Sequence, residues 1–169
     1  MSDFMHCLPE GARSYYIQRR NVRQAEDRKN YDTKLGDLRN EASARGILRS
    51  GMTYKAEWDT KAEFLDTLAL GNVEVSLETC KLYEVELTTV RCACLEKTAS
   101  DFLTLQYGMQ IQNKGRGGSD VHIPNSAIQT ISIRTFAVMS RIKVIIEEAR
   151  VEDVKRKPRP PSMRLAPPQ

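Results

Sequence analysis

The fold predicted from the sequence depends on residues 73–87, which read VEVSLETCKLYEVEL, and on residues 103–111, which read LTLQYGMQI. Apolar and polar side chains alternate in both segments, so apolar residues recur at every second position. A period of two places one set of side chains on each face of a β-strand. Valine, threonine and aromatic residues are also dense here, and they suit a pleated surface. The pattern therefore predicts antiparallel strands.

Three shorter segments extend the predicted sheet. Alternation continues over residues 90–94, and apolar pairs recur at residues 121–123 and 131–133. The glycine-rich residues 113–120 predict a loop, and Pro124 predicts one helical turn before the last strand. Five strands with a short turn before the last are typical of a small SH3-like or Sm-like barrel. We therefore predict an α+β fold with an antiparallel β-barrel flanked by N-terminal helices and a C-terminal helix.

An all-α elongated bundle is the alternative. Residues 73–111 contain one glycine and no proline, and Val73, Cys80, Leu87 and Cys94 follow a heptad spacing. The companion positions of that heptad, such as Ser76 and Lys97, fit a helical seam less well, and strands are preferred for that reason.

The regions around the predicted barrel, residues 72–135, are helical or extended. Residues 1–29 form a basic N-terminal arm, and residues 30–71 predict a helical pair. Residues 136–157 predict a closing amphipathic helix. Its first turns are unusually apolar, so we expect it to cover an open barrel end or a partner. The proline-rich basic tail, residues 158–169, is expected to be extended.

Residues 64–134 resemble the Sm-like (Sm/Hfq) family. The segments that carry the resemblance are Phe64–Leu68, Val73–Leu77, Lys81-Leu82, Val85–Leu87 and Ile123–Ile133. They match that family's opening helix, first two strands and final strand pair. The loops that contact RNA in that family correspond to residues 90–93 and 123–126, where this sequence has different residues. The resemblance implies a small barrel and an RNA ligand.

Positive charge is concentrated at the two ends of the chain and in the glycine-rich loop. The chain has 26 basic and 22 acidic residues, and its net charge of +4 is mild for a nucleic-acid-binding protein. Lysine and arginine contact phosphate without regard to base sequence. The predicted nucleic-acid-binding residues are Arg19, Arg20, Arg23, Lys114, Arg116, Lys155, Arg156, Lys157 and Arg159.

No catalytic motif is present in the sequence. The two histidines, His6 and His122, have no nucleophile and base arranged around them, so we expect no enzyme, no cofactor and no small-molecule substrate. Cys80, Cys92 and Cys94 with His122 do not have the paired spacing of a structural zinc site, so no metal is expected. The cysteine spacing fits a reducing compartment, and no membrane span or signal peptide is apparent. We therefore expect a cytoplasmic protein.

Two functional hypotheses follow. The first is a non-catalytic RNA-associated Sm-like protein, whose barrels associate through strand edges and whose basic segments touch phosphate. The second is a structural or adaptor subunit that binds other proteins through its helical arms and tail. Either hypothesis implies a protein partner or a homo-oligomer, because exposed strand edges or apolar helix faces need to be covered.

Overall fold

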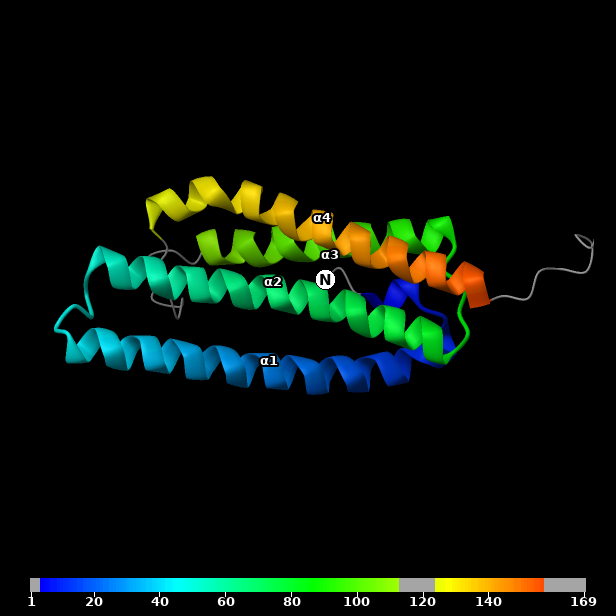
Figure 1. Cartoon of the computed structure of the whole chain (residues 1–169), viewed down its shortest axis with the longest axis horizontal. Helices are drawn as coiled ribbons and strands as arrows, with labels where there is room; N and C mark the ends of the chain where they lie inside the picture. Colours follow the sequence, from blue (N-terminus) through cyan, green and yellow to red (C-terminus); the bar gives the residue numbers. More distant parts are fainter. Residues whose placement is uncertain (1–3, 113–123, 157–169) are drawn as a thin grey trace, which may run out of the picture.

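The computed structural model describes residues 4–112 and 124–156, and every regular element in these ranges is helical. A short 3-10 helix, η1 (Phe4–Cys7), precedes four long helices: α1 (Glu10–Ala44), α2 (Gly51–Leu82), α3 (Thr89–Gln112) and α4 (Asn125–Arg156). Figure 1 shows them lying side by side along one long axis. The predicted β-barrel is therefore wrong, and the all-α elongated bundle is the correct alternative.

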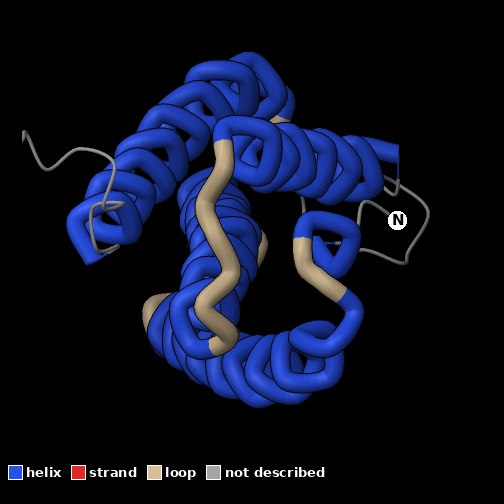
Figure 2. Tube along the Cα trace, turned by 90° about the vertical axis from the view of Figure 1, so that its right-hand side faces the viewer, coloured by secondary structure: helices blue, strands red, loops and turns tan. Residues whose placement is uncertain are grey.

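The helix α2 lies at the centre of the bundle. It packs against α1 on one side and against α3 and α4 on the other, and η1 contacts both α2 and α3. Figure 2, which looks along the bundle, shows α2 between the other helices and contains no strand in the described residues. Because α2 has neighbours on opposite sides, it is buried around most of its circumference.

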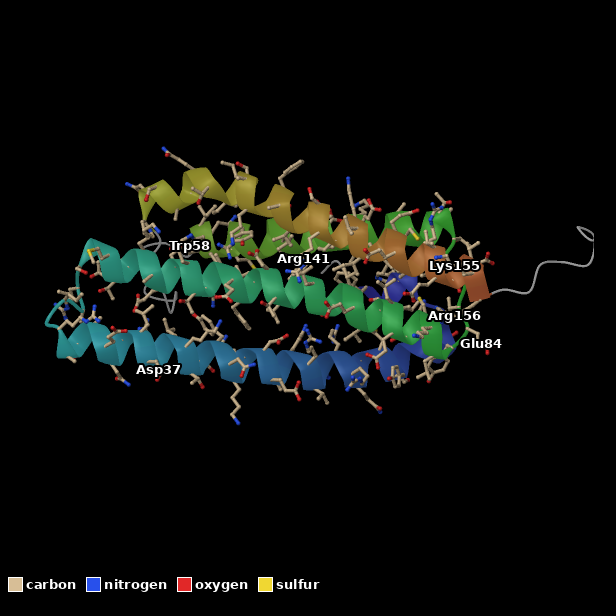
Figure 3. All side chains as sticks on the ribbon, viewed as in Figure 1. Asp37, Trp58, Glu84, Arg141, Lys155 and Arg156 are labelled. Atoms are coloured by element: carbon tan, nitrogen blue, oxygen red, sulfur yellow. A yellow bond between two sulfur atoms is a disulfide. The ribbon has the colours of Figure 1, made fainter. Side chains whose placement is uncertain are left out.

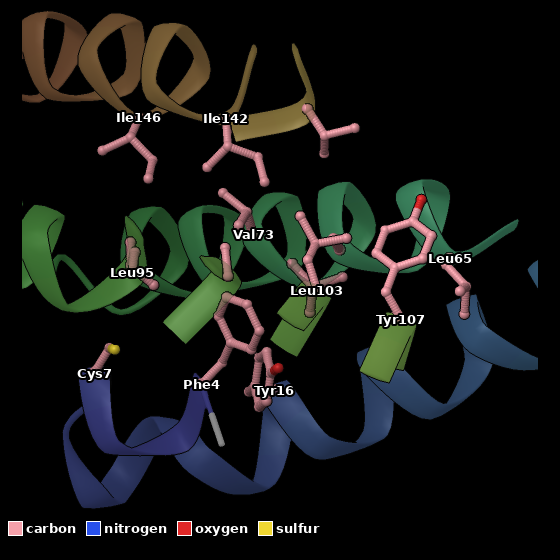
Figure 4. Close-up of a cluster of buried hydrophobic side chains, with 14 of the residues drawn as sticks. Phe4, Cys7, Tyr16, Leu65, Val73, Leu95, Leu103, Tyr107, Ile142 and Ile146 are labelled. Atoms are coloured by element: carbon pink, nitrogen blue, oxygen red, sulfur yellow. The ribbon is translucent and has the colours of Figure 1, made fainter. Parts of the chain in front are cut away.

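This position explains why α2 resembles a strand in sequence. Val73 and Val75 are both buried, at 0% and 3% exposure. Residues two positions apart on a helix are separated by more than half a turn, so the side chains of Val73 and Val75 point to opposite sides of α2. Val73 lies with Ile142 of α4 in the core (Figure 4), whereas Val75 lies beside Arg19 of α1. Apolar alternation here reflects a helix with two buried faces, and the strand predicted at residues 73–77 is helical.

The hydroxyl residues of α2 are accommodated by hydrogen bonds to their own helix. Ser76 Oγ donates to the carbonyl of Asn72 at 2.8 Å, and Thr79 Oγ1 donates to the carbonyl of Val75 at 2.7 Å. Both side chains are fully buried. Bonds of this kind satisfy a hydroxyl inside a helix. Ser76 is therefore compatible with the helix, and its use as an argument for strands is wrong.

The run at residues 103–111 belongs to α3 and contains two interleaved helical stripes. Leu103 and Tyr107 are buried, at 0% and 2% exposure, and continue a buried stripe of Cys92, Leu95 and Ala99. Leu105 and Met109 are 42% and 41% exposed on another side of the helix. Residues four apart share a helix face, so two such stripes offset by two residues produce the alternation of a strand.

The remaining predicted strand elements differ in outcome. Residues 90–94, predicted to extend the sheet, lie inside α3, and residues 83–87 belong to the link between α2 and α3. Residues 131–133, predicted as the final strand, lie inside α4, and Pro124 directly precedes that helix. Pro124 donates no hydrogen bond and has a fixed φ, which suits a helix start as well as an isolated turn. The loop at 113–120, the strand at 121–123 and the tail at 158–169 lie outside the described residues.

A polar network ties α2, α3 and α4 together inside the bundle. The Asp66 carboxylate accepts hydrogen bonds from the Tyr107 hydroxyl at 2.6 Å and from Arg134 Nε at 2.5 Å. Burial raises the pKa of Asp66, although both hydrogen bonds favour its charged form. Each of the three helices contributes one member, so this network fixes their mutual register.

A disulfide fastens η1 to the bundle. Cys7 and Cys94 are bonded across a sequence separation of 87 residues, with their Cα atoms 5.8 Å apart. Arg91 Nε also donates to the carbonyl of Cys7 at 3.1 Å. The spacing of the cysteines in the sequence does not predict this pair. Disulfides persist mainly in oxidising compartments, so the bond argues against the cytoplasmic location, which stays a prediction.

Candidate protein-binding surface

The helix α4 has two apolar faces on opposite sides. Its inner face packs into the core through Val138, Ile142 and Ile146, which are 9%, 0% and 1% exposed. Figure 4 shows Ile142 and Ile146 pointing from α4 toward α2. An ordinary surface helix would carry polar residues opposite such a stripe.

The opposite side of α4, which we name the α4 outer face, is also apolar. Its large side chains are far more exposed than those of the inner face: Ile133 (70%), Phe136 (75%), Val144 (56%), Val151 (42%) and Val154 (69%). The exposed residues Ala137 and Ser140 lie between them. Most of these positions follow a heptad spacing, which keeps them on one side of the helix over its length. No described helix of this chain covers the α4 outer face.

Charged residues flank the middle of the α4 outer face, and their sign changes along the helix. Arg141 and Lys143 lie just before Val144, and Glu147 and Glu148 lie just after it. All four side chains are exposed. Glu147 accepts hydrogen bonds from Arg150 at 2.7 and 2.9 Å, which lower its pKa. Figure 3 shows Arg141 near the middle of α4.

A second apolar surface is a groove between α1 and α3. The groove has a volume of about 320 Å³ and runs past η1, with α2 as its floor. It exists because α1 packs mainly on α2 and leaves a gap toward α3. Its apolar lining residues are Phe4, Tyr16, Leu68, Phe102, Leu105 and Met109. Phe4 of η1 forms part of its wall.

A third hollow, of about 350 Å³, lies between α1 and α2. The stacked rings of Tyr31 and Phe64, whose centroids are 4.6 Å apart, line this hollow. The Lys61 ammonium lies 4.9 Å from the Tyr31 ring centroid, and Lys34 pairs with Glu63 at 3.0 Å. These charged groups interact within the chain, so the hollow is part of the α1–α2 interface.

The predicted nucleic-acid-binding residues of α1 lie against α2. Arg19 forms an ion pair with Glu78 at 3.3 Å, and Arg23 forms one with Glu74 at 3.1 Å. The Arg20 guanidinium lies 5.5 Å from the Tyr16 ring centroid. Arg19 and Arg23 therefore help to hold α1 on α2, whereas the contact of Arg20 with Tyr16 lies within α1. Contact of these three arginines with RNA stays a prediction.

The other predicted nucleic-acid-binding residues do not gather into one described patch. Lys155 and Arg156 lie at the C-terminal end of α4, close to the α2–α3 link that contains Glu84 (Figure 3). Arg156 pairs with Glu152 at 3.3 Å. Lys114, Arg116, Lys157 and Arg159 lie outside the described residues. RNA binding by these residues stays a prediction.

The free thiols are placed for packing. Cys80 and Cys92 are 1% and 7% exposed, and burial raises the pKa of Cys80 to about 11. Burial also raises the pKa of Cys92. A neutral buried thiol is a poor nucleophile and a poor metal ligand at neutral pH. Residues 4–112 and 124–156 contain no group of three or more histidine, cysteine or acidic side chains that could hold a metal ion, and His122 lies outside these ranges.

The sequence contains the signal for the α4 outer face. From the sequence, the apolar first turns of the helix predicted at residues 136–157 indicate a surface that covers a barrel end or a partner. Projecting residues 133–154 onto a helical wheel places the residues of the α4 outer face on one side. Within the described part of the chain, none of the helices has the length and apolarity needed to span a bilayer. No protein-family model, curated protein or solved structure matches this chain.

Proposed function

We propose that the chain is a non-catalytic structural or adaptor protein that binds another protein through the α4 outer face. The α4 outer face carries this proposal because it is an exposed apolar stripe on a helix whose opposite side is already packed in the core. Extended apolar patches on soluble proteins usually mark interaction sites. The heptad spacing favours a helix as the partner element, since such a seam accepts side chains from a facing helix.

The length of the α4 outer face also supports a protein partner. From Ile133 to Val154 the stripe extends about 32 Å at 1.5 Å per residue. A small molecule would cover a fraction of such a surface, and it would prefer a concave site. A helix laid along α4 would bury all five large side chains at once.

The RNA hypothesis has less support in the structure. Its barrel is absent from the described residues, and Arg19 and Arg23 are engaged with glutamates of α2. No arrangement of the described residues favours a phosphate backbone over a protein surface. Filter binding with a salt series remains the direct test of that hypothesis.

The proposal is tested with Val144→Glu and a matched control, Val22→Glu. Val144 and Val22 are 56% and 51% exposed, and both lie in the middle of a long helix. Each has an arginine three residues before it and a glutamate four residues after it. The two substitutions therefore have similar local electrostatic and helix-propensity effects, but only one alters the α4 outer face.

The measurement is quantitative mass spectrometry of proteins that co-purify with the tagged full-length chain from its source cells. We expect Val144→Glu to remove at least one stoichiometric component, which can be this chain in its untagged form, and Val22→Glu to retain it. Both variants should keep the far-ultraviolet circular dichroism of the wild-type protein. An identical set of components for all three proteins would contradict the proposal.

A further inference from the structure

We infer that the protein partner of the α4 outer face is a second copy of this chain, whose α4 lies antiparallel to the first about a two-fold axis near Val144. This inference rests on the proposed function and names the partner for the same surface. The charge pattern along α4 and the positions of its exposed apolar residues carry it.

The charge pattern is complementary to itself when one helix is reversed. In an antiparallel pair centred near Val144, Arg141 of each copy lies opposite Glu147 and next to Glu148 of the partner copy. Lys143 lies two residues, about 3 Å along the helix, from the position opposite Glu147. Arg141, Lys143 and Glu148 form no ion pair within the described residues, so they are available for these contacts. Opposite charges at the edges of a helix seam set its orientation and register.

The apolar residues fall into register in the same arrangement. Residues equally far from the axis on either side face each other across the pair. Ala137 therefore lies opposite Val151, and Val144 faces its own copy. Ile133 and Val154 lie opposite each other to within one residue, because they are 11 and 10 residues from Val144. The polar residue Ser140 faces the region of Glu147 and Glu148, so the few polar positions on the stripe also meet polar positions.

A parallel pair fits the same residues less well. Glu147 occupies a position of the stripe, four residues before Val151, and its carboxylate pairs with Arg150 of the same helix at 2.7 Å. In a parallel pair it would face its own copy, and two carboxylates would meet in a partly desolvated seam. In the antiparallel pair Glu147 instead lies opposite Arg141 of the partner copy, so no two carboxylates meet. The orientation therefore follows from the charges, whereas the apolar residues alone would allow both.

The predicted interface is small. One helix pair over a stripe of about 32 Å belongs to the lower size class of protein interfaces, which are often transient. We therefore expect a reversible dimer with a dissociation constant on the order of micromolar. The mass of the full-length protein should rise with concentration from 19.2 kDa toward twice that value.

Cysteine cross-linking under mild oxidation tests the arrangement in the full-length protein. The native cysteines contribute little background, because Cys7 and Cys94 are bonded to each other and Cys80 and Cys92 are buried. Val144→Cys should form a covalent dimer, since the axis passes near this residue. Ile133→Cys alone should not, because its two copies would be about 33 Å apart at 1.5 Å per residue. A mixture of Ile133→Cys and Val154→Cys proteins should cross-link.

Sedimentation equilibrium of the wild-type protein accompanies the cross-linking. Val144→Glu should raise the dissociation constant at least about tenfold relative to Val22→Glu. A wild-type protein that remains monomeric up to about 100 µM would overturn the inference, and so would self-cross-linking of Ile133→Cys, which indicates a parallel pair. If the wild-type protein is monomeric but Val144→Glu still loses a co-purifying component, the proposed function stands with a different protein as the partner.

Discussion

Replacing Leu103 and Leu105 separately by alanine distinguishes the helical bundle from a sheet. On a strand these two side chains would share one face and would both be buried in the barrel. On α3 they point to different sides, with Leu103 fully buried and Leu105 42% exposed. A sheet therefore predicts similar losses in the free energy of unfolding for the two leucine-to-alanine substitutions, whereas the helical bundle predicts a much larger loss at Leu103.

The magnitudes follow from burial. Truncating a fully buried leucine removes its transfer free energy and leaves a cavity, which together cost about 2–5 kcal/mol. Leu103 lies in the core, one helix turn from Tyr107 (Figure 4), so we expect a loss of about 3 kcal/mol for Leu103→Ala. Leu105 borders the open groove between α1 and α3, and Leu105→Ala should cost about 1 kcal/mol or less.

Urea unfolding followed by circular dichroism at 222 nm measures both free energies of unfolding. If the free energy of unfolding falls with urea concentration at the same slope in both variants, neither substitution changes the surface exposed on unfolding. The two urea midpoints can then be compared directly. Equal losses of several kcal/mol for Leu103→Ala and Leu105→Ala would refute the helical placement of α3 and would restore the strand interpretation.

Three further predictions concern stability. Reducing the Cys7–Cys94 disulfide, or replacing Cys94 by serine, should lower the free energy of unfolding by up to about 4 kcal/mol, because the bond closes a long loop; a reductant that leaves wild-type thermal unfolding unchanged contradicts this. Arg134→Met should cost about 3 kcal/mol, because it leaves a buried carboxylate without its cation, whereas Arg156→Met, at an exposed pair, should cost less than about 0.5 kcal/mol; similar urea midpoints for the two variants would rule out a structural role for the network. The pKa of Cys80 is raised from 9.0 to about 11, so the unfolded chain loses this proton first. The stability contributed by the neutral thiol is present below pH 9.0 and is lost as the pH rises through about 11. We expect the free energy of unfolding of the wild-type protein to fall by on the order of 2 kcal/mol across this range. Chemical unfolding of Cys80→Ala over the same range should show no such fall.

The position of α2 in the bundle is the main reason why the sequence pattern misleads. Sequence periodicity reveals a helix when one face is buried and the other is solvated. α2 has buried residues facing α1 and others facing α3 and α4, so Val73 and Val75 are both apolar although they point apart. Its length and its lack of helix-breaking proline are the signals that favour a helix here. Only the tertiary arrangement explains the burial on both sides.

The α3 stripe was available in the sequence. Cys92, Leu95, Ala99, Leu103 and Tyr107 recur at intervals of three and four residues, as expected for one helix face. The exposed residues Leu105 and Met109 obscure this stripe, because they add apolar residues between its members. Their presence follows from the open groove between α1 and α3.

Neither the disulfide nor the polar network could be predicted from spacing. Cys7 and Cys94 are distant in sequence, and their approach depends on η1 folding back onto α3. Asp66 and Arg134 likewise meet only after α2 and α4 pack together. The α4 outer face is different, because both stripes of α4 are local features of one helix and can be derived from its sequence.

Hydroxyl-radical footprinting of the α4 outer face tests the central claim most directly. Phe136 is 75% exposed on the isolated chain, and its labelling can be followed by mass spectrometry. At concentrations where the wild-type protein is assembled, we expect Phe136 to be labelled less in the wild-type protein than in Val144→Glu. The exposed residue Val90 should be labelled equally in both. Equal labelling of Phe136 in the two proteins would show that nothing covers the α4 outer face.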